Sequence, residues 1–242
     1  MTTKKIYKIL DITLPIFTTL LIFAIYAIVS KAVGVELIAP SLGSVFKEFF
    51  ALLGDVDFYK AALGTLARAA LAYILSFAVA TVLALLTKLC RPLKKSFAQI
   101  VAVIRVLPTI SLILLTLIWF NSFQATVAVA FCVIFPMLYT CMCGAMDSVD
   151  KDLLQMAKVY KIDKKRLIFR IYIPQMTPTL FTGIKSSIGL NLKLVIAAEV
   201  LAQTAESMGL YMKLAKINLD TASLLAWTLV AVVMGALVEG LV

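Results

Sequence analysis

The stretch AALGTLARAALAYILSFAVATVLALLT, residues 61–87, decides the class of this protein. Its only charged side chain is Arg68, and it is long enough to cross the hydrocarbon core of a bilayer as a helix, which takes about 20 apolar residues. Outward from it, five further apolar stretches of similar length can be found along the chain. The sequence therefore predicts an all-α membrane protein with six spans, at residues 14–33, 61–87, 100–120, 123–145, 183–202 and 222–241.

The composition excludes several other classes. Of the 242 residues, 62% are hydrophobic and 15% are charged, whereas soluble domains are roughly half apolar and a quarter charged. The chain has no histidine, which excludes His-ligated metals and Ser–His or Cys–His nucleophile pairs. Its four cysteines form no C-x-x-C motif and are expected to be small buried hydrophobic residues. No cofactor, metal or catalytic residue is expected, and the six spans leave no room for a soluble catalytic domain.

The first apolar stretch has an alternative interpretation as a secretory signal. Lys4, Lys5 and Lys8 precede it, and Ser30-Lys31-Ala32 loosely resembles a cleavage site. However, an uncleaved span is favoured, because the apolar stretch exceeds the about 7–15 residues of a signal sequence.

The basic residues predict the orientation of the chain. With the N-terminus inside, 15 of the 23 lysines and arginines fall in cytoplasmic segments and five fall outside. Cytoplasmic loops carry the excess of Lys and Arg, so both termini are predicted to be cytoplasmic. The net charge of +10 is then a signal of topology, and no nucleic-acid partner is expected.

Two of the connecting segments have a helical pattern. After Ser41, a plausible N-cap, apolar residues recur at helical spacing, which predicts a short helix in the outer membrane interface or packed against other parts of the protein. The segment 146–182 is the longest cytoplasmic connection. In it, Leu153, Met156, Ala157 and Tyr160 share a narrow apolar face among many charges. Such a helix is suited to a groove on a partner protein.

At this loop the chain resembles the permease subunits of bacterial ABC importers, which have a Glu-Ala-Ala, three residues, Gly pattern and a later apolar-Pro pair. Here Gln155-Met156-Ala157 is followed by Lys161 and by Ile173-Pro174, so Glu, the first Ala and Gly are replaced. These departures concern the fine geometry of the loop and not its role. The loop residues that the resemblance assigns to ATPase coupling are Asp152, Leu153, Leu154, Gln155, Met156, Ala157, Tyr160, Lys161 and Pro174.

Other motifs extend the resemblance from about residue 36 to the C-terminus. They are Arg105-Val106-Leu107-Pro108, then Pro174 with Pro178 and Gly183, and Lys193 followed by Ala198-Glu199-Val200 and Gly209. The last set is similar to the nitrate, sulfonate and taurine branch. The resemblance implies a type I (MetI-like) fold and a permease that pairs with a second permease, two ATPase subunits and an extracytoplasmic binding protein in a bacterial plasma membrane. The resemblance then assigns ATP hydrolysis to the ATPase subunits. In agreement with this, the sequence of this chain contains no phosphate-binding loop motif.

A charged residue inside a span indicates a structural or functional role, because inserting its side chain at the bilayer centre costs about 2.5–3.5 kcal/mol on insertion scales. Lys193 lies near the centre of its span, where it either lines an anion path or makes a structural ion pair. Glu199 does not share a helical face with Lys193, and both Glu199 and Arg68 lie toward the outer end of their spans. These two either pair or form an outer gate. The candidates for the path or gate are Arg68, Arg105, Asn191, Lys193 and Glu199.

The sequence thus indicates an importer permease for a small anion such as nitrate, a sulfonate or taurine. Two alternatives stay open, namely the same type of importer for a pyrimidine vitamin precursor and a self-contained secondary transporter. The latter is expected to show internal repeats, and none is convincing here. An intramembrane enzyme is disfavoured, because the spans contain no nucleophile motif and no paired acidic residues.

Overall fold

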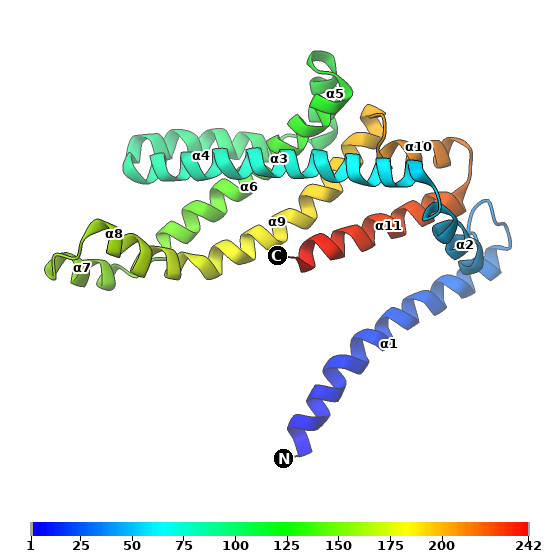
Figure 1. Cartoon of the computed structure of the whole chain (residues 1–242), viewed down its shortest axis with the longest axis horizontal. Coiled ribbons are helices and arrows are strands. Elements are labelled where there is room, and N and C mark those ends of the chain that lie inside the picture. Colours follow the sequence, from blue (N-terminus) through cyan, green and yellow to red (C-terminus); the bar gives the residue numbers. More distant parts are fainter. Residues whose placement is uncertain (1, 242) are drawn as a thin grey trace. The chain divides into compact units, whose positions relative to one another are not determined.

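The computed structural model describes the backbone of residues 2–241, and the side chains of all of these except 2–12, 15, 16, 19, 91, 151 and 164. The described chain is helical, with short connections (Figure 1). In chain order it contains α1 (Thr2–Val33), α2 (Leu42–Leu52), α3 (Val56–Leu89), α4 (Arg91–Val106), α5 (Thr109–Trp119), α6 (Ser122–Asp147), α7 (Lys151–Val159), α8 (Lys164–Leu167), a π-helical turn (Ile168–Tyr172), α9 (Ile173–Ala202), α10 (Met208–Ile217) and α11 (Thr221–Gly240).

The prediction of a helical membrane protein is confirmed. Three described helices, α3, α6 and α11, are long and apolar enough to cross a membrane, and α4 and α5 together make a fourth, broken span. In α1, the apolar helix among the described residues is Leu20–Val33. α9 contains Lys185, Lys193 and Glu199, which lower its mean hydropathy. The total of six spans is compatible with this structure and stays a prediction.

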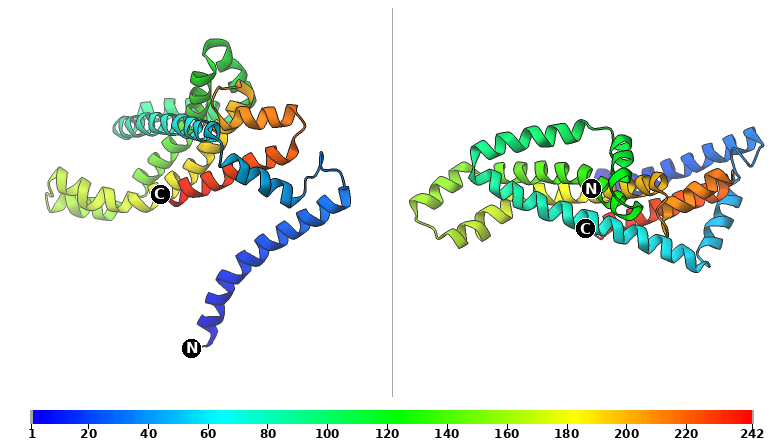
Figure 2. Two further views of the ribbon diagram at one scale, coloured as in Figure 1. Left: turned by 45° about the vertical axis from the view of Figure 1, so that its right-hand side comes forward. Right: turned by 90° about the horizontal axis from the view of Figure 1, so that it is seen from above.

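The predicted span 100–120 differs from a continuous helix. It is interrupted at Leu107 and Pro108, where both residues are extended, with ψ of 128° and 127°. Proline has no N–H to donate and disfavours the helical conformation of the residue before it, so α4 has to end there. The axes of α4 and α5 differ by 98°, as the right-hand view of Figure 2 illustrates.

The expectation that the cysteines are buried is wrong. Cys90 is exposed, and Cys132, Cys141 and Cys143 are each partly exposed. Cys90 occupies the connection between α3 and α4, outside either helix, and the other three lie on sides of α6 that its neighbours only partly cover.

The chain divides into two compact units, of which one comprises residues 1–55 and 211–230. In it, the hydroxyl of Ser30 donates to the carbonyl of Ala39 at 2.9 Å, and Thr221 donates to the carbonyl of Glu36 at 3.0 Å. α2 begins as predicted, because Ser41 accepts a hydrogen bond from the Ser44 backbone at 3.1 Å. Phe50 on the predicted apolar face of α2 is 65% exposed, so a location in the interface stays a prediction.

The other unit comprises residues 56–210 and 231–242, and its core lies where α3, α6 and α9 pack against one another. α3 contributes the small residues Ala72, Ser76, Ala80 and Ala84, spaced four apart and all fully buried. Small side chains let helix backbones approach closely, which is how helices associate in membranes. Ile134 and Leu138 of α6 are among the largest fully buried side chains.

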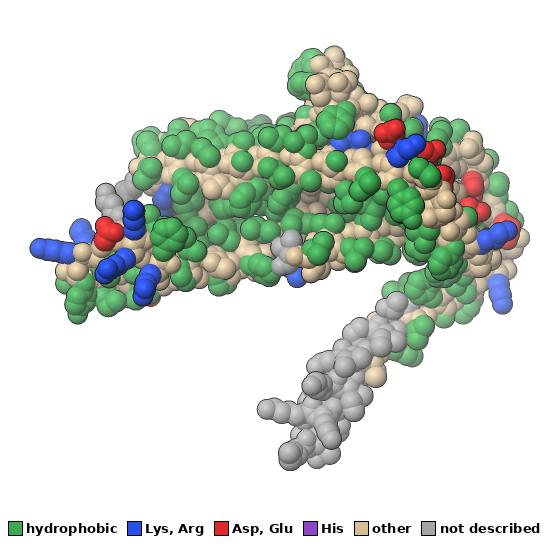
Figure 3. Space-filling view, in the orientation of Figure 1, with side chains coloured by type: hydrophobic (Ala, Val, Ile, Leu, Met, Phe, Trp, Pro, Cys, Tyr) green, Lys and Arg blue, Asp and Glu red, His purple; other side chains and the backbone are tan. Residues whose placement is uncertain are grey.

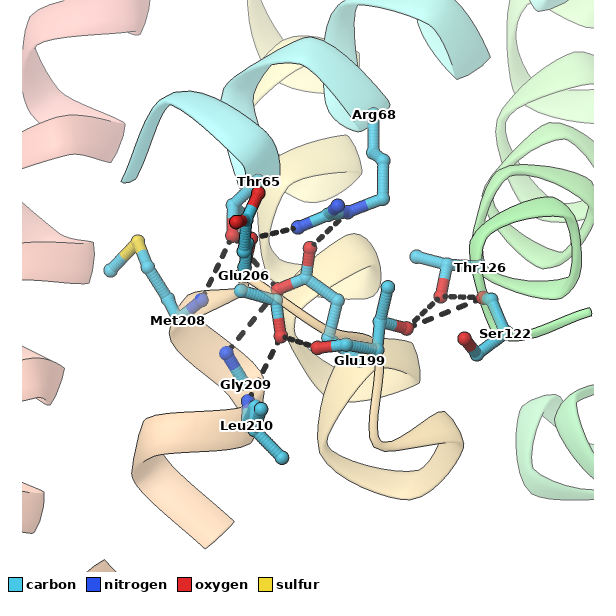
Figure 4. Close-up of polar contacts among 11 residues, drawn as sticks. Thr65, Arg68, Ser122, Thr126, Glu199, Glu206, Met208, Gly209 and Leu210 are labelled. Carbon is cyan, nitrogen blue, oxygen red and sulfur yellow. Dashed lines mark hydrogen bonds and ion pairs between the residues drawn. The ribbon is translucent and has the colours of Figure 1, made fainter. Parts of the chain in front are cut away.

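Within this unit, a buried ion pair joins α3 to α9 (Figure 4). Nε of Arg68 lies 2.7 Å from Oε1 of Glu199, and the exposed fractions of the two side chains are 5% and 0%. Thr65 donates its hydroxyl to Oε2 of Glu199 at 2.9 Å, and the Gly209 backbone donates to the same oxygen at 3.3 Å. The carboxylate therefore holds α3, α9 and the first turn of α10 together, and the negative charge stabilises that helix N-terminus.

Two glycines make room for this arrangement, which we call the Arg68–Glu199 cluster and define as Thr65, Arg68, Glu199, Glu206 and Gly209. Nη2 of Arg68 donates to the Glu206 carbonyl at 2.9 Å. A Cβ on Gly64 would overlap that same carbonyl, and a Cβ on Gly209 would overlap the Glu199 side chain and lie 2.6 Å from the Val200 nitrogen. Both positions therefore require glycine because of close packing.

We predict that Glu199→Gln strongly destabilises the protein. The substitution leaves the buried Arg68 guanidinium without its counterion, and breaking a buried pair on one side costs about 3–5 kcal/mol. The exposed pair Lys60–Asp57, with N–O distance 2.8 Å, provides a matched control. Asp57→Asn is expected to cost about 0.5 kcal/mol or less. Thermal unfolding of both variants in the same detergent checks this, and equal midpoints for the two would contradict it.

Candidate functional site

The loop 146–182 contains the predicted coupling residues, and its helix α7 is fixed at its N-terminus. Asp150 caps the helix, because its carboxylate accepts a hydrogen bond from the Asp152 backbone at 2.8 Å. The Asp150 backbone donates in turn to the Gln175 side chain at 2.8 Å. The start of α7 is thereby tied to the start of α9.

α7 has a buried side and an exposed apolar side. Ala157 is 3% exposed, and Leu153 and Leu154 are partly buried. Met156, Val159 and Tyr160, which are spaced three and four residues apart, are 47%, 78% and 74% exposed. We call these three residues the outer face of α7. The sequence identified Met156 and Tyr160 but grouped them with Ala157, which is buried, and it missed Val159.

The end of α7 explains one departure from the family pattern. The Ile162 N–H bonds to the Ala157 carbonyl at 2.9 Å and the Lys161 N–H to the Lys158 carbonyl at 3.2 Å, which is the Schellman arrangement. In that arrangement the residue after the cap is left-handed, and Lys161 has φ of 49°. Glycine is the usual residue there, so Lys161 adopts the conformation that the expected Gly would take.

After α7, the chain returns through α8 and the π-helical turn into α9. The Ile173 N–H bonds to the Ile168 carbonyl, one residue wider than in an α-helix. Pro174 follows directly and has no N–H to donate, so the wider turn accommodates it. Lys161, Arg166 and Arg170 line an open cavity beside Asp163. Figure 3 shows the basic side chains gathered at this end of the molecule.

The helix ends next to the loop are joined by a shared carboxylate. Asp147, the last residue of α6, accepts hydrogen bonds from the Nζ atoms of Lys88 and Lys94, each at 2.7 Å. Lys88 also donates to the Met146 carbonyl at 3.1 Å. α3, α4 and α6 are thus connected where the loop begins. Apart from the charges at the three helix ends, no sequence pattern indicates this contact.

The five candidates for the path or gate do not form one group. Arg68 and Glu199 are paired with each other and buried, which is one of the two options left open by the sequence. Asn191 is 4% exposed and donates to the Ala69 carbonyl at 2.8 Å, so it joins α9 to α3. Arg105 is exposed and lines a separate cavity with Tyr139 and Lys94.

Lys193 is the candidate that differs most from the others. It is exposed on α9, and it makes no hydrogen bond or ion pair with any side chain that the structure describes. Glu199, six residues later, is fully buried, which agrees with the prediction that the two do not share a face. An ammonium without a partner in the middle of a long helix is available to an anion.

Comparisons with known proteins place these features in a family. Residues 76–242 match the model of the binding-protein-dependent transport system inner membrane component. Nitrate import permease proteins of Synechococcus elongatus and Leptolyngbya laminosa are 25% and 26% identical over 139 residues. Those residues are 57% of this chain and 50% of each relative, so the match covers about half the length of the relatives.

A longer match is found in an archaeon. A Methanocaldococcus jannaschii protein, itself assigned only provisionally as an ABC transporter permease, is 22% identical over 205 residues. These are 83% of this chain and 76% of that protein. The family is a transport component and not an enzyme, as the composition predicted. With its model matched over most of the sequence, this chain belongs to the family of binding-protein-dependent transport system inner membrane components.

Proposed function

We propose that this chain is the transmembrane permease subunit of an ATP-driven ABC importer that carries a small anion delivered by a binding protein. The observation that carries the proposal is the outer face of α7, where Met156, Val159 and Tyr160 expose apolar surface on a helix with charged flanks. In a family of binding-protein-dependent transport components, such a face needs a protein partner outside the membrane. An ATPase subunit with a hydrophobic groove fits this requirement.

The contacts around α7 are suited to transmitting force. Asp150 is bonded to Gln175 at the start of α9, and the Asp147 carboxylate joins the ends of α3 and α4. When an ATPase closes on nucleotide and moves α7, these bonds pass the movement to three membrane helices. The predicted coupling residues act here in two ways. The helix packs against the rest of this chain through Ala157, Leu153 and Leu154. The ATPase subunit is contacted by Met156 and Tyr160.

The assembly follows from the family pattern and remains a proposal. Two permease copies face each other, each with one ATPase, in a bacterial plasma membrane with both termini cytoplasmic. A self-contained secondary transporter is the second candidate function. Purification from native membranes separates the two, because an ATPase that copurifies supports the importer and a chain that transports alone supports the carrier.

The anion is proposed from Lys193 and from the names of two relatives. Lys193 offers an unpaired positive charge on α9, and the relatives are nitrate import permeases of low identity. Nitrate, sulfonates and taurine all present oxygen atoms that an ammonium can bind. A pyrimidine vitamin precursor is the alternative cargo. The binding protein encoded by a neighbouring gene can be tested for ligands. A rise in its melting temperature with nitrate, an alkanesulfonate, taurine or a pyrimidine precursor distinguishes these substrates.

We predict that Val159→Asp uncouples the complex. A carboxylate in an apolar groove has to be desolvated, so the ATPase is expected to lose most of its stimulation by substrate-loaded binding protein. Lys158→Gln, one residue earlier, removes charge but no apolar surface and is expected to keep the stimulation. ATPase activity and uptake of the reconstituted complex are the measurements. Full stimulation of the folded Val159→Asp complex would remove the docking assignment.

Ala157→Asp is a less selective probe, because Ala157 is buried and the variant also disturbs the loop.

We predict that Lys161→Gly preserves coupling and Lys161→Val impairs it. Glycine adopts a φ of 49° without strain, whereas a β-branched residue there is a severe outlier. Relief of the left-handed strain is worth about 1 kcal/mol, so the glycine variant is also expected to resist limited proteolysis of the loop at least as well as the parent. Equal coupling in both variants would show that the left-handed turn is unimportant for the ATPase contact.

We predict that Lys193→Met abolishes uptake while assembly stays intact. Methionine keeps the apolar stem and removes the charge, so an anion loses its attraction to the path. Lys185→Met provides the control, because Lys185 is another exposed lysine of α9 whose Nζ lies over the Phe181 ring at 5.8 Å. Uptake of radiolabelled substrate and copurification of the ATPase are measured together. Normal uptake by Lys193→Met would exclude the anion proposal.

A further inference from the structure

We propose that Glu239 is the internal counterion of Lys193 and competes with the transported anion for its ammonium. The inference rests on the proposed function in one respect, which is that Lys193 lines the path. The juxtaposition of the two side chains does not depend on it. Glu239 lies in the last turn of α11, far from Lys193 in the sequence, and the sequence pattern did not single it out.

The first observation is where the Glu239 carboxylate lies. It packs against α9 at Gly189, because a Cβ on Gly189 would overlap the carboxylate, with the carboxyl carbon 2.8 Å away. One turn earlier on α11, Gly235 faces Leu192 of the same helix, where a Cβ would be 3.9 Å from its Cδ2. This end of α11 therefore lies along the α9 surface from Leu192 to Gly189, and the missing side chain of Gly189 creates the space that the carboxylate fills.

The second observation is that the carboxylate has no partner. Glu239 is only partly exposed, and within the described chain it makes no hydrogen bond or ion pair. A carboxylate within the membrane region is costly unless it is paired or hydrated. A cation that pairs with it has to lie near Gly189.

The third observation is the position of Lys193 on the same face as Gly189. Residues four apart in an α-helix lie above one another, about 6 Å along the axis. Helical side chains lean toward the N-terminus of the helix, so the flexible Lys193 side chain is directed along α9 toward Gly189 and the carboxylate beside it. Lys185, four residues on the other side of Gly189, leans away from it, and its ammonium lies over Phe181. The geometry therefore selects Lys193.

These positions give the pair a role in transport. Once the Lys193 ammonium has turned toward Glu239, the carboxylate holds it and the two charges neutralise each other. A substrate anion then binds Lys193 only by displacing the carboxylate. The pair thus sets the affinity of the path for its anion low enough for release, since a conducting site must bind its ion without trapping it.

A double-mutant cycle on stability tests the pair whatever the protein transports. Glu239→Gln and Lys193→Met each keep the shape of the side chain, and the complex purified with its partners is melted for each single variant and for the double variant. We expect each single change to lower the melting temperature by about 2–4 °C and the double change to lower it no further. The cycle of Glu239→Gln with Lys185→Met is the matched control and is expected to be additive.

Uptake measurements test the competition separately. Glu239→Gln removes the competitor, so the KM for the transported anion is expected to fall about fivefold or more. Additive losses in the Glu239–Lys193 cycle, or coupling of Glu239 to Lys185 instead, would overturn the ion pair. A coupled cycle with an unchanged KM in Glu239→Gln and normal uptake in Lys193→Met would overturn the competition and with it the proposed path, while the pair itself would stand.

Discussion

The buried ion pair between Arg68 and Glu199 is the constraint on which the packing of α3, α9 and the start of α10 depends. Its charges are almost fully removed from solvent, so each is tolerable only because the other is 2.7 Å away and because Thr65 and Gly209 complete the hydrogen bonds of the carboxylate. The glycines at 64 and 209 are required by the same geometry. A chain of hydroxyls continues the network, since Thr204 lies 3.1 Å from Thr126 of α6 and Ser207 caps α10. The end of α9 is thereby fixed on three helices.

The fold was largely predictable because one physical signal, the length of apolar runs, decides it. The helical class, the helix after Ser41 and the boundary between the predicted spans 100–120 and 123–145, where Asn121 caps α6, all follow from that signal and from capping preferences. The break at Pro108 was foreseeable in kind, but its angle depends on which helices α4 and α5 pack against. Partial exposure of the cysteines was not predictable, because it depends on how much of each helix its neighbours cover.

The candidate site was predictable in its parts and not in its grouping. Periodicity located α7 but could not tell which side of it faces the protein, so Ala157 and Met156 were grouped although one is buried and the other exposed. The sequence indicated that the charged residues inside spans either have partners or line a path. Which of these charges have a partner depends on contacts between distant segments. No local sequence pattern indicates that Glu239 packs on Gly189. Nor does one indicate that Lys88 and Lys94 share Asp147.

α3 is one uninterrupted helix of 34 residues, about 50 Å long, and both sets of ionic contacts are attached to it. Arg68, about a third of the way along α3, is fixed to Glu199, and Lys88, in its last turn, is fixed to Asp147, roughly 30 Å away. A continuous helix is stiff along its axis, and the buried Ala72, Ser76, Ala80 and Ala84 let neighbouring helices pack close to it. The two ion pairs therefore cannot shift independently along the α3 axis, because one unbroken backbone joins them.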